Sequence, residues 1–307
     1  MSVHPKVAVL IRAHLDAPFL MEALESVNDQ DYVGEIEVFL ILDRLEKHIV
    51  DNIIKNKYRF AIILLENNSR DIASGLNLAL ERTSASHIAI LDSDDRMNRS
   101  RISKQVNYLN VHGYSAIGSD LNLISESGLK KGELEMPKGV HVKQLLLENS
   151  TIAHPSSLFI KKDIMSVGSY RSFYEYAEDY DLWLRVNESY KIGNINQFLT
   201  DYRVHSSQLT KSKLKRHVWA VLAVKESLGL RISGLPELHE SFPDISAWKK
   251  QGNKRIIRAV TFRVMYSKAA ISKANSVYKM QNLGHLLFVL ILNPNFFISS
   301  IRKKFSE

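Results

Sequence analysis

Short apolar runs alternate with helical patterns over residues 7–124, and this alternation constrains the fold more than any other feature. Apolar runs of strand length separated by amphipathic segments are typical of βαβ units, which build a largely parallel sheet. The apolar runs predict strands at Val7–Ile11, Ile36–Leu42, Arg59–Leu64, Ile88–Leu91 and Ser115–Gly118. The helical patterns lie near Phe19–Asn28, Glu46–Lys55, Asp71–Arg82 and Arg101–His112. We therefore predict an α/β fold with helices flanking a mostly parallel sheet.

Polar side chains stand at the ends of several predicted strands. Arg12, Asp43 and Asn68 each lie at or shortly after the carboxyl end of a strand. In open α/β sheets these ends share one edge, which is where ligands bind. We expect the three side chains to converge at that edge with the acidic residues that follow the strand Ile88–Leu91.

Those acidic residues form the sequence Asp92-Ser93-Asp94-Asp95. Carboxylates packed this closely repel one another, so such a cluster usually persists where a cation neutralises it. A solvated turn with one aspartate as helix N-cap explains only one of the three acids. An EF-hand loop is excluded, because it needs Gly and Glu where this chain has Met97 and Ser103. The cluster predicts a site for a divalent cation, and a phosphoryl-transfer enzyme with an aspartate nucleophile stays open as an alternative.

A second pair of acids, Glu178 and Asp179, lies in the aromatic-rich segment YAEDYDLWLRV. Acids are favoured in the first turn of a helix, because they complement its dipole. The surrounding aromatic side chains add a second effect, since partial desolvation raises the basicity of a carboxylate. The local pattern is therefore compatible with a helix terminus and with a general base.

The segment Asp201-Tyr202-Arg203-Val204-His205 follows a strand-like apolar run. A single histidine is more often a structural or surface residue than a ligand, and spacing does not decide between these roles. If the strand returns to the acidic cluster, a neutral imidazole with carboxylates would suit Mn²⁺ or Mg²⁺ and leave positions for phosphate oxygens.

Composition excludes several classes of site. The chain of 307 residues has no cysteine, which excludes disulfides, thiolate nucleophiles and cysteine-ligated metals. Its net charge of +8 is uneven: residues 208–307 carry 18 Lys and Arg against 5 Asp and Glu, whereas residues 1–207 carry 23 against 28. We predict one domain over residues 1–208 and a basic helical region over residues 209–307. The N-terminal apolar run is too short for a secretory signal, so we expect a cytoplasmic protein.

The basic region contains an apolar segment, Leu283–Ile301, followed by Arg302, Lys303 and Lys304. The segment is interrupted by Asn293-Pro294-Asn295 and falls short of the ~20 apolar residues that span a bilayer. A buried core helix and a helix lying on the inner face of an anionic membrane both remain open. The basic residues are not interleaved with an aromatic stacking platform, so no nucleic-acid partner is expected.

The order of these motifs resembles the family-2 inverting glycosyltransferases of GT-A fold over about residues 5–207. The segments that carry the resemblance are VAVLIRAHLDAPFLMEALESVNDQDY, ENNSRDIASGLNLALERTSASHIAILDSDDRMNRSRISKQVNYL, HPSSLFIKKDIMSVGSYRSFYEYAEDYDLWLRV and YRVHSSQLT. The resemblance implies a GT-A type Rossmann-like sheet, a UDP-sugar donor and Mn²⁺ or Mg²⁺. It also implies transfer of a hexose or N-acetylhexosamine, with inversion, to a glycan or lipid-linked glycan in surface polysaccharide biosynthesis. A non-catalytic scaffold for glycan assembly is a further alternative.

The resemblance also implies roles for individual residues. Asp92-Ser93-Asp94 corresponds to the DxD motif, with Asp92 on the ribose side and Asp94 on the metal. The remaining matches imply nucleotide-base binding by Asp43, catalytic-base function for Asp179 with Glu178 beside it, and a place at the metal and diphosphate for His205. Arg12 and Asn68 complete the expected donor site. The chain departs from the family at Arg12, where Pro is common, and after Asp43, where many members continue with Gly and Ser.

Overall fold

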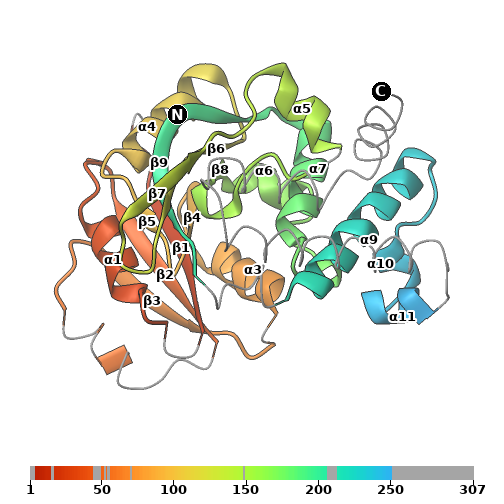
Figure 1. The fold of residues 1–307 in the computed structure, drawn as a ribbon, viewed down its shortest axis with the longest axis horizontal. Coiled ribbons are helices and arrows are strands. Elements are labelled where there is room, and N and C mark those ends of the chain that lie inside the picture. The colour runs from red at the N-terminus through yellow and green to blue at the C-terminus, as the bar shows by residue number, and fades with distance from the viewer. Residues whose placement is uncertain are drawn as a thin grey trace, which may run out of the picture.

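The computed structural model describes residues 4–250, apart from residues 15–16, 44–49, 52, 54–55, 70, 148 and 206–212. Within these residues a nine-stranded sheet has the order β3-β2-β1-β4-β8-β6-β9-β5, and β7 pairs with β6 (Figure 1). The strands are β1 (Val7–His14), β2 (Ile36–Asp43), β3 (Ala61–Glu66), β4 (His87–Asp92), β5 (Arg96–Met97), β6 (Ala116–Ile124), β7 (Lys130–Leu134), β8 (Leu158–Ile160) and β9 (Ile192–Arg203).

Helices surround this sheet. They are α1 (Leu20–Asn28), α3 (Ile72–Arg82), α4 (Arg101–His112), α5 (Val140–Leu146), α6 (Lys161–Ser166), α7 (Glu178–Ser189), α9 (Leu214–Ile232), α10 (Leu238–Ser241) and α11 (Ile245–Lys250), with short 3-10 helices η1 (His154–Ser156) and η2 (Ser172–Tyr174). The helix predicted over residues 46–55 falls largely outside the described residues.

The first four strands of the sheet order, β3, β2, β1 and β4, pair in parallel. Their carboxyl ends therefore share one edge, as the sequence predicts. Strand β6 continues to Ile124, well past the predicted end at Gly118, because it pairs with β9 along its length. Strand β8 runs antiparallel between β4 and β6, an arrangement that the sequence did not predict. The predicted α/β fold is confirmed.

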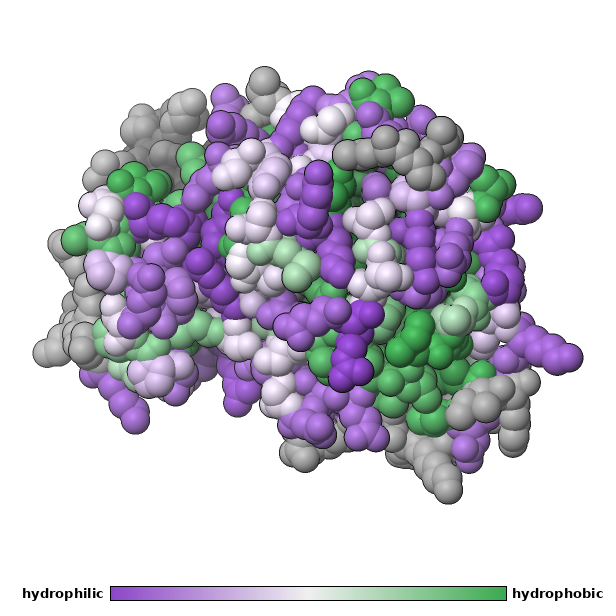
Figure 2. Space-filling model, turned by 180° about the vertical axis from the view of Figure 1, so that it is seen from behind, coloured by the Kyte–Doolittle hydropathy of each residue, from purple (hydrophilic) through white to green (hydrophobic). Residues whose placement is uncertain are grey.

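Side chains alternate between the two faces of the central strands, and each face has its own apolar cluster. Leu10 and Ile90 pack in a cluster with residues of α3, α7 and α9. Val9 and Leu91 belong to the opposite cluster, with residues of α1 and α4. The two faces are therefore buried by different helices, which leaves the carboxyl edge of β1, β2 and β4 for polar side chains. Seen from behind, hydrophilic residues are interspersed with apolar ones, and an apolar patch lies at the lower right of the view (Figure 2).

The described part of the C-terminal region packs on the rest of the protein. Helix α9 contributes Val218, Ala220 and Ala223, each fully buried, to the same apolar cluster as α7. None of the described helices combines the length and the apolar character needed to cross a membrane. The predicted apolar segment Leu283–Ile301 and the basic residues after it lie outside the described residues.

Candidate functional site

The carboxyl ends of β1, β2 and β4 bring three of the predicted residues together. Arg12 Nη2 donates to Asp43 Oδ2 at 3.1 Å, and Arg12 is the register partner of Asp92. His14, at the end of β1, lies with Nδ1 2.9 Å from the Asp43 carbonyl. Buried Asp43 keeps Oδ1 without a hydrogen-bond partner, and so does Arg12 Nε. This part of the edge thus offers one free acceptor and one free donor.

Asn68 is placed differently from its neighbour. Its side chain is exposed, whereas Asn67 is buried. Asn67 Nδ2 donates to the Asp71 carbonyl at 2.9 Å, and Asn67 Oδ1 accepts from Ser69 at 2.7 Å. Asn67 therefore shapes the turn into α3, and Asn68 is the asparagine whose side chain is open to a ligand.

The acidic cluster after β4 is compact. One carboxylate oxygen from each of Asp92, Asp94 and Asp95 lies within 4.8 Å of the others. Burial and the neighbouring Asp94 raise the pKa of Asp92 to about 7, against the opposing effect of Arg12. Burial, Asp94 and Asp92 raise the pKa of Asp95 well above its usual range. Ser93 is partly buried between these acids. The cluster therefore favours binding of a proton or a cation.

Asp95 forms a hydrogen bond with the last residue of strand β9. Its Oδ1 accepts the backbone N–H of Arg203 at 2.8 Å, and Arg203 Nε donates to the Asp94 carbonyl at 2.7 Å. The Arg203 side chain is fully buried, stacks over Phe19 at 4.1 Å and donates to Glu22 at 2.7 Å. The contact between Asp95 and Arg203 was not predicted from the sequence, since only the folded chain brings these residues together.

His205 follows two residues after Arg203 and reaches the acidic cluster. Its Nε2 lies 2.7 Å from Asp94 Oδ2, and its ring packs against Phe19. Carboxylate oxygens beside an imidazole form a donor set that suits Mn²⁺ or Mg²⁺. In addition, the buried Asp95 Oδ2 has no hydrogen-bond partner. The residues therefore fit a divalent cation.

A buried arginine lies beneath the cluster. Arg101, the first residue of α4, is fully buried and donates to the carbonyls of Ile90, Pro155 and Ser157 at 2.8, 2.7 and 3.0 Å. Burial lowers the pKa of Arg101 to about 9, although Asp95 and Asp92 counter this effect. Arg101 thus joins the end of β4 to η1 and β8.

The second acidic pair, Glu178 and Asp179, occupies the first turn of α7, a position that the sequence left open. Burial and the neighbouring Asp179 raise the pKa of Glu178 to about 8. Burial also raises the pKa of Asp179, while His154, the helix N–H groups and the Ser150 hydroxyl favour its charged form. Asp179 in turn contributes to the raised pKa of Asp92 in the acidic cluster. The site therefore has an acidic side, the cluster at the end of β4, and a carboxylate side, Glu178 and Asp179 at the start of α7.

Two residues of the carboxylate side were not predicted as site residues. The charge of Asp179 raises the pKa values of both His154 and Tyr170, although burial lowers the pKa of His154 overall. The His154 Nε2 atom lies 2.9 Å from the Tyr170 hydroxyl. A histidine followed by proline is not a catalytic motif, and only the fold brings His154 to Tyr170.

A pocket of about 820 Å³ lies at a different place, along α1 and β5. Its lining residues are Met21, Glu22, Glu25, Ser26, Asn28, Asp29, Gln30, Arg59, Arg96, Met97, Arg99 and Asp201. None of the predicted site residues is among them. Its arginines are interspersed with acids, so the lining has no net preference for one charge.

Comparison with known proteins gives the following matches. A family model described as Glycosyl transferase family 2 matches residues 8–168. The "O-antigen biosynthesis glycosyltransferase WbnJ" of Escherichia coli is 28% identical over 73% of this chain and 90% of its own length. The "UDP-Gal:alpha-D-GlcNAc-diphosphoundecaprenol beta-1,3-galactosyltransferase" of Escherichia coli is 30% identical over 72% of this chain and 81% of its own length.

Solved structures share the fold. S. aureus TarS 1-349 in complex with UDP-GlcNAc matches with a TM-score of 0.55 at 16% identity, over 72% of this chain and 66% of that one. The mannosyltransferase PcManGT from Pyrobaculum calidifontis, in complex with GDP-Man and Mn²⁺, matches with a TM-score of 0.60 at 15% identity, over 94% of this chain and 85% of that one. The described residues therefore adopt a fold seen in glycosyltransferases.

Proposed function

The chain belongs to glycosyltransferase family 2, and from this premise we propose that it transfers a hexose or N-acetylhexosamine from a UDP-sugar to a glycan hydroxyl, with inversion. The GT-A type fold expected from the motif order is confirmed. One observation carries the proposal: His205 contacts Asp94 of the acidic cluster, and the charge of Asp179 contributes to the raised pKa of Asp92 in that cluster.

The donor would bind along the carboxyl edge of the sheet. Asp43 Oδ1 and Arg12 Nε are the unpartnered acceptor and donor there, and they would hydrogen-bond the nucleotide base. Asp92, the register partner of Arg12, would contact the ribose. Asn68 and Ser93 would bind at the rim of the same site. An unpartnered acceptor atom next to an unpartnered donor atom supports nucleotide recognition, because a buried polar atom without a hydrogen bond destabilises the protein.

Asp94 and His205 would hold Mn²⁺ or Mg²⁺. Such a cation would supply the positive charge that a departing nucleoside diphosphate needs. Asp94 and His205 already lie in contact, so little rearrangement is required to bring both to one ion.

Asp179 would act as the general base. Its raised pKa reflects a carboxylate that takes up a proton more readily than an exposed one. It would accept the proton of the acceptor hydroxyl while that oxygen attacks the anomeric carbon from the face opposite the diphosphate. One displacement of this kind converts an α-linked donor into a β-glycoside. Glu178 would orient the acceptor beside it.

The relatives support a surface polysaccharide role. One is named for O-antigen biosynthesis, and two are named for transfer to GlcNAc-diphosphoundecaprenol. We propose a lipid-linked glycan as the acceptor. The basic region over residues 209–307 would then hold the protein at the inner, anionic face of the cell membrane, as a domain following residues 1–208.

The proposal is tested with purified protein and UDP-Glc, UDP-Gal, UDP-GlcNAc and UDP-GalNAc, with GDP-Man as a donor of another nucleotide class. Mn²⁺-dependent release of UDP from one UDP-sugar, enhanced by a GlcNAc-diphosphate lipid, is the expected result. Turnover of a phosphate ester without any sugar acceptor would favour a phosphoryl-transfer enzyme instead. Binding of the glycan lipid without hydrolysis or transfer would favour a scaffold.

A further inference from the structure

The phenylalanine ring that precedes α1 lies against the end of β9. The centroid of the Phe19 ring is 5.6 Å from that of His205, with the two ring planes at 60°. The guanidinium carbon of Arg203 lies 4.1 Å from the same Phe19 centroid. A tilted aromatic pair and a cation over a ring are both attractive arrangements. One partly buried side chain from the start of the chain thus contacts two residues at the end of β9.

The turn before α1 determines the position of this ring. Ala17 has a positive φ of 35°, which residues other than glycine seldom adopt. Its carbonyl accepts the N–H of Leu20 at 3.0 Å, and the carbonyl of Phe19 accepts the N–H of Ala23 at 3.1 Å. A strained conformation of this kind persists only where the surroundings determine it. The backbone that carries Phe19 is therefore fixed by the first turn of α1.

Arg203 connects the Phe19 ring to the acidic cluster. Its side chain is fully buried, and all three of its guanidinium nitrogens donate hydrogen bonds. Nε reaches the Asp94 carbonyl at 2.7 Å, Nη1 reaches the Glu126 carbonyl at 2.6 Å, and Nη2 reaches Glu22 Oε2 at 2.7 Å. The bond to Asp94 is made to its carbonyl, whereas the carboxylate Oδ2 of Asp94 contacts His205. Arg203 therefore holds the backbone of a proposed cation ligand.

The start of α1 supplies two of the contacts to Arg203. Phe19 and Glu22 are three residues apart, a spacing that places side chains on the same side of a helix. Glu22 Oε2 also lies 3.5 Å from Arg96 Nη1, and Arg96 Nη2 lies 3.0 Å from Asp201 Oδ2 of β9. The end of β9 is therefore held to α1 by linked ion pairs as well as by the aromatic ring.

We propose that Phe19 and Arg203 are positioning residues for the cation site. Arg203 ties the backbone of Asp94 to the end of β9, and the Phe19 ring holds the His205 imidazole beside the Asp94 carboxylate. A divalent cation requires its ligand atoms at fixed separations. Removal of a residue that orients a metal ligand typically lowers metal affinity about 10- to 100-fold. The inference rests on the proposed function, in which Asp94 and His205 hold the cation.

The first test replaces the ring in the full-length protein. Phe19→Leu keeps an apolar side chain but loses the aromatic contacts, so its affinity for Mn²⁺ in the presence of UDP should fall about 10-fold. Phe19→Tyr keeps the ring and should retain the affinity within about 2-fold. Free Mn²⁺ is measured by electron paramagnetic resonance, which does not depend on turnover.

Phe198→Leu is the matched control for the ring. Phe198 is also partly buried, and Lys130 Nζ lies 5.8 Å from its centroid, so this variant loses a cation–π contact elsewhere on β9. Its affinity for Mn²⁺ should stay within about 2-fold of that of the unmodified protein.

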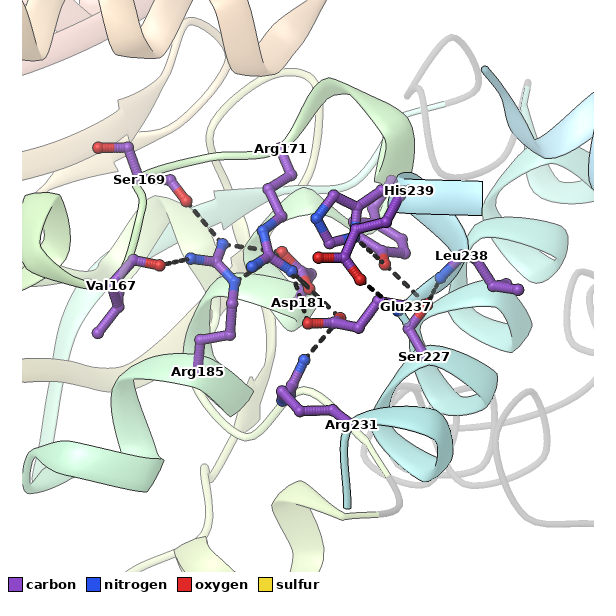
Figure 3. Close-up of polar contacts among 12 residues, drawn as sticks. Val167, Ser169, Arg171, Asp181, Arg185, Ser227, Arg231, Glu237, Leu238 and His239 are labelled. Carbon is purple, nitrogen blue, oxygen red and sulfur yellow. Dashed lines mark hydrogen bonds and ion pairs between the residues drawn. The ribbon is translucent and has the colours of Figure 1, made fainter. Parts of the chain in front are cut away.

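A second test separates positioning from stability by comparing Arg203→Lys with Arg185→Lys. Figure 3 shows Arg185 of α7, a buried arginine whose guanidinium donates to the carbonyls of Val167 and Ser169 and pairs with Asp181 at 2.8 Å. Both variants should lower the midpoint of urea unfolding, because each leaves buried groups without a hydrogen bond. Only Arg203→Lys should lower the affinity for Mn²⁺, by about 10-fold. The Phe19 variants keep the inference testable if either lysine variant fails to fold.

A double-mutant cycle decides whether the ring acts through His205. In the His205→Ala background, Phe19→Leu should cause no further loss of Mn²⁺ affinity, whereas independent effects would multiply. Multiplying effects, or equal Mn²⁺ affinities in Phe19→Leu and Phe198→Leu, would overturn the inference. Failure of the unmodified protein to bind Mn²⁺ would instead refute the proposed cation site itself, so the two failures are distinguishable.

Discussion

The Nε2 atom of His205 lies 2.7 Å from the Oδ2 atom of Asp94, across a sequence separation of 111 residues. The contact exists because β9 returns beside β5 and because the Asp95 carboxylate accepts the Arg203 N–H. One strand end thus supplies the acids, and another supplies the imidazole.

Removal of either partner should weaken binding of a divalent cation. In His205→Ala and Asp94→Ala, titration of Mn²⁺ in the presence of UDP should show affinity reduced by about 10-fold or more, since each variant loses one ligand. His112→Ala provides the control, because His112 is an exposed histidine at the end of α4. An unchanged Mn²⁺ affinity in both site variants would refute the assignment of the two ligands.

Asp179→Asn should abolish transfer while preserving donor binding. Loss of a general base typically costs about 10²- to 10⁴-fold in rate. The donor contacts proposed for Asp43 and Arg12 stay in place, so the affinity for UDP measured by calorimetry should not change. Asp31→Asn, at an exposed carboxylate, is the matched control. Turnover close to that of the unmodified enzyme in Asp179→Asn would exclude its role as the base.

The pH dependence of stability should reveal the buried Glu178. Its pKa is about 8 in the folded protein against an ordinary value of 4.5, so the folded state holds the proton over this range and the unfolded state does not. The contribution of Glu178 to the free energy of unfolding is therefore greatest at low pH. It is lost as the pH rises towards 8, by at most about 1.4 kcal/mol per pH unit. Urea unfolding is measured in the presence of a metal chelator. As the pH rises from 5.5 to 8, the free energy of unfolding of Glu178→Gln should increase relative to that of the unmodified protein. Parallel curves for the two proteins would contradict this.

Arg101→Met should destabilise the fold strongly. The change leaves the carbonyls of Ile90, Pro155 and Ser157 without their buried donor, which should cost about 3–5 kcal/mol of unfolding free energy. Chemical denaturation measures the loss as a lower midpoint at an unchanged slope. Arg99→Met, at an exposed position two residues earlier, should change the midpoint by less than about 0.5 kcal/mol. Equal effects of the two substitutions would contradict the role given to Arg101.

The basic C-terminal segment should govern binding to anionic membranes. Replacing Arg302, Lys303 and Lys304 by Gln in the full chain should reduce flotation with phosphatidylglycerol vesicles, since each basic residue near such a surface contributes about 1 kcal/mol. Lys130 and Lys131 of β7, both exposed, give the control when changed to Gln. Truncation after residue 208 is a poor test, because it removes α9 and its buried Val218 and Ala223. Equal flotation of all variants would refute the membrane role.

Local patterns predicted much of the fold and part of the site. The alternation of apolar runs indicated β1 to β4 and the helices α1, α3 and α4, since periodicity reflects which side chains face the core. The acids at the end of β4 and at the start of α7 could be identified from the sequence, because they form close clusters next to apolar or aromatic residues. Asn68 was selected on sequence position, while its neighbour Asn67 proved to be the buried residue of that turn.

The sequence by itself determined the parallel βαβ half of the protein and the chemical types of residue in its site, because both follow from neighbouring residues. Only the tertiary structure decided which distant residues meet. The antiparallel entry of β8 between β4 and β6, the contact of Asp95 with Arg203 and the approach of Tyr170 to His154 all join segments far apart in the chain. Such contacts depend on the packing of whole elements and on buried hydrogen bonds, which no local periodicity encodes.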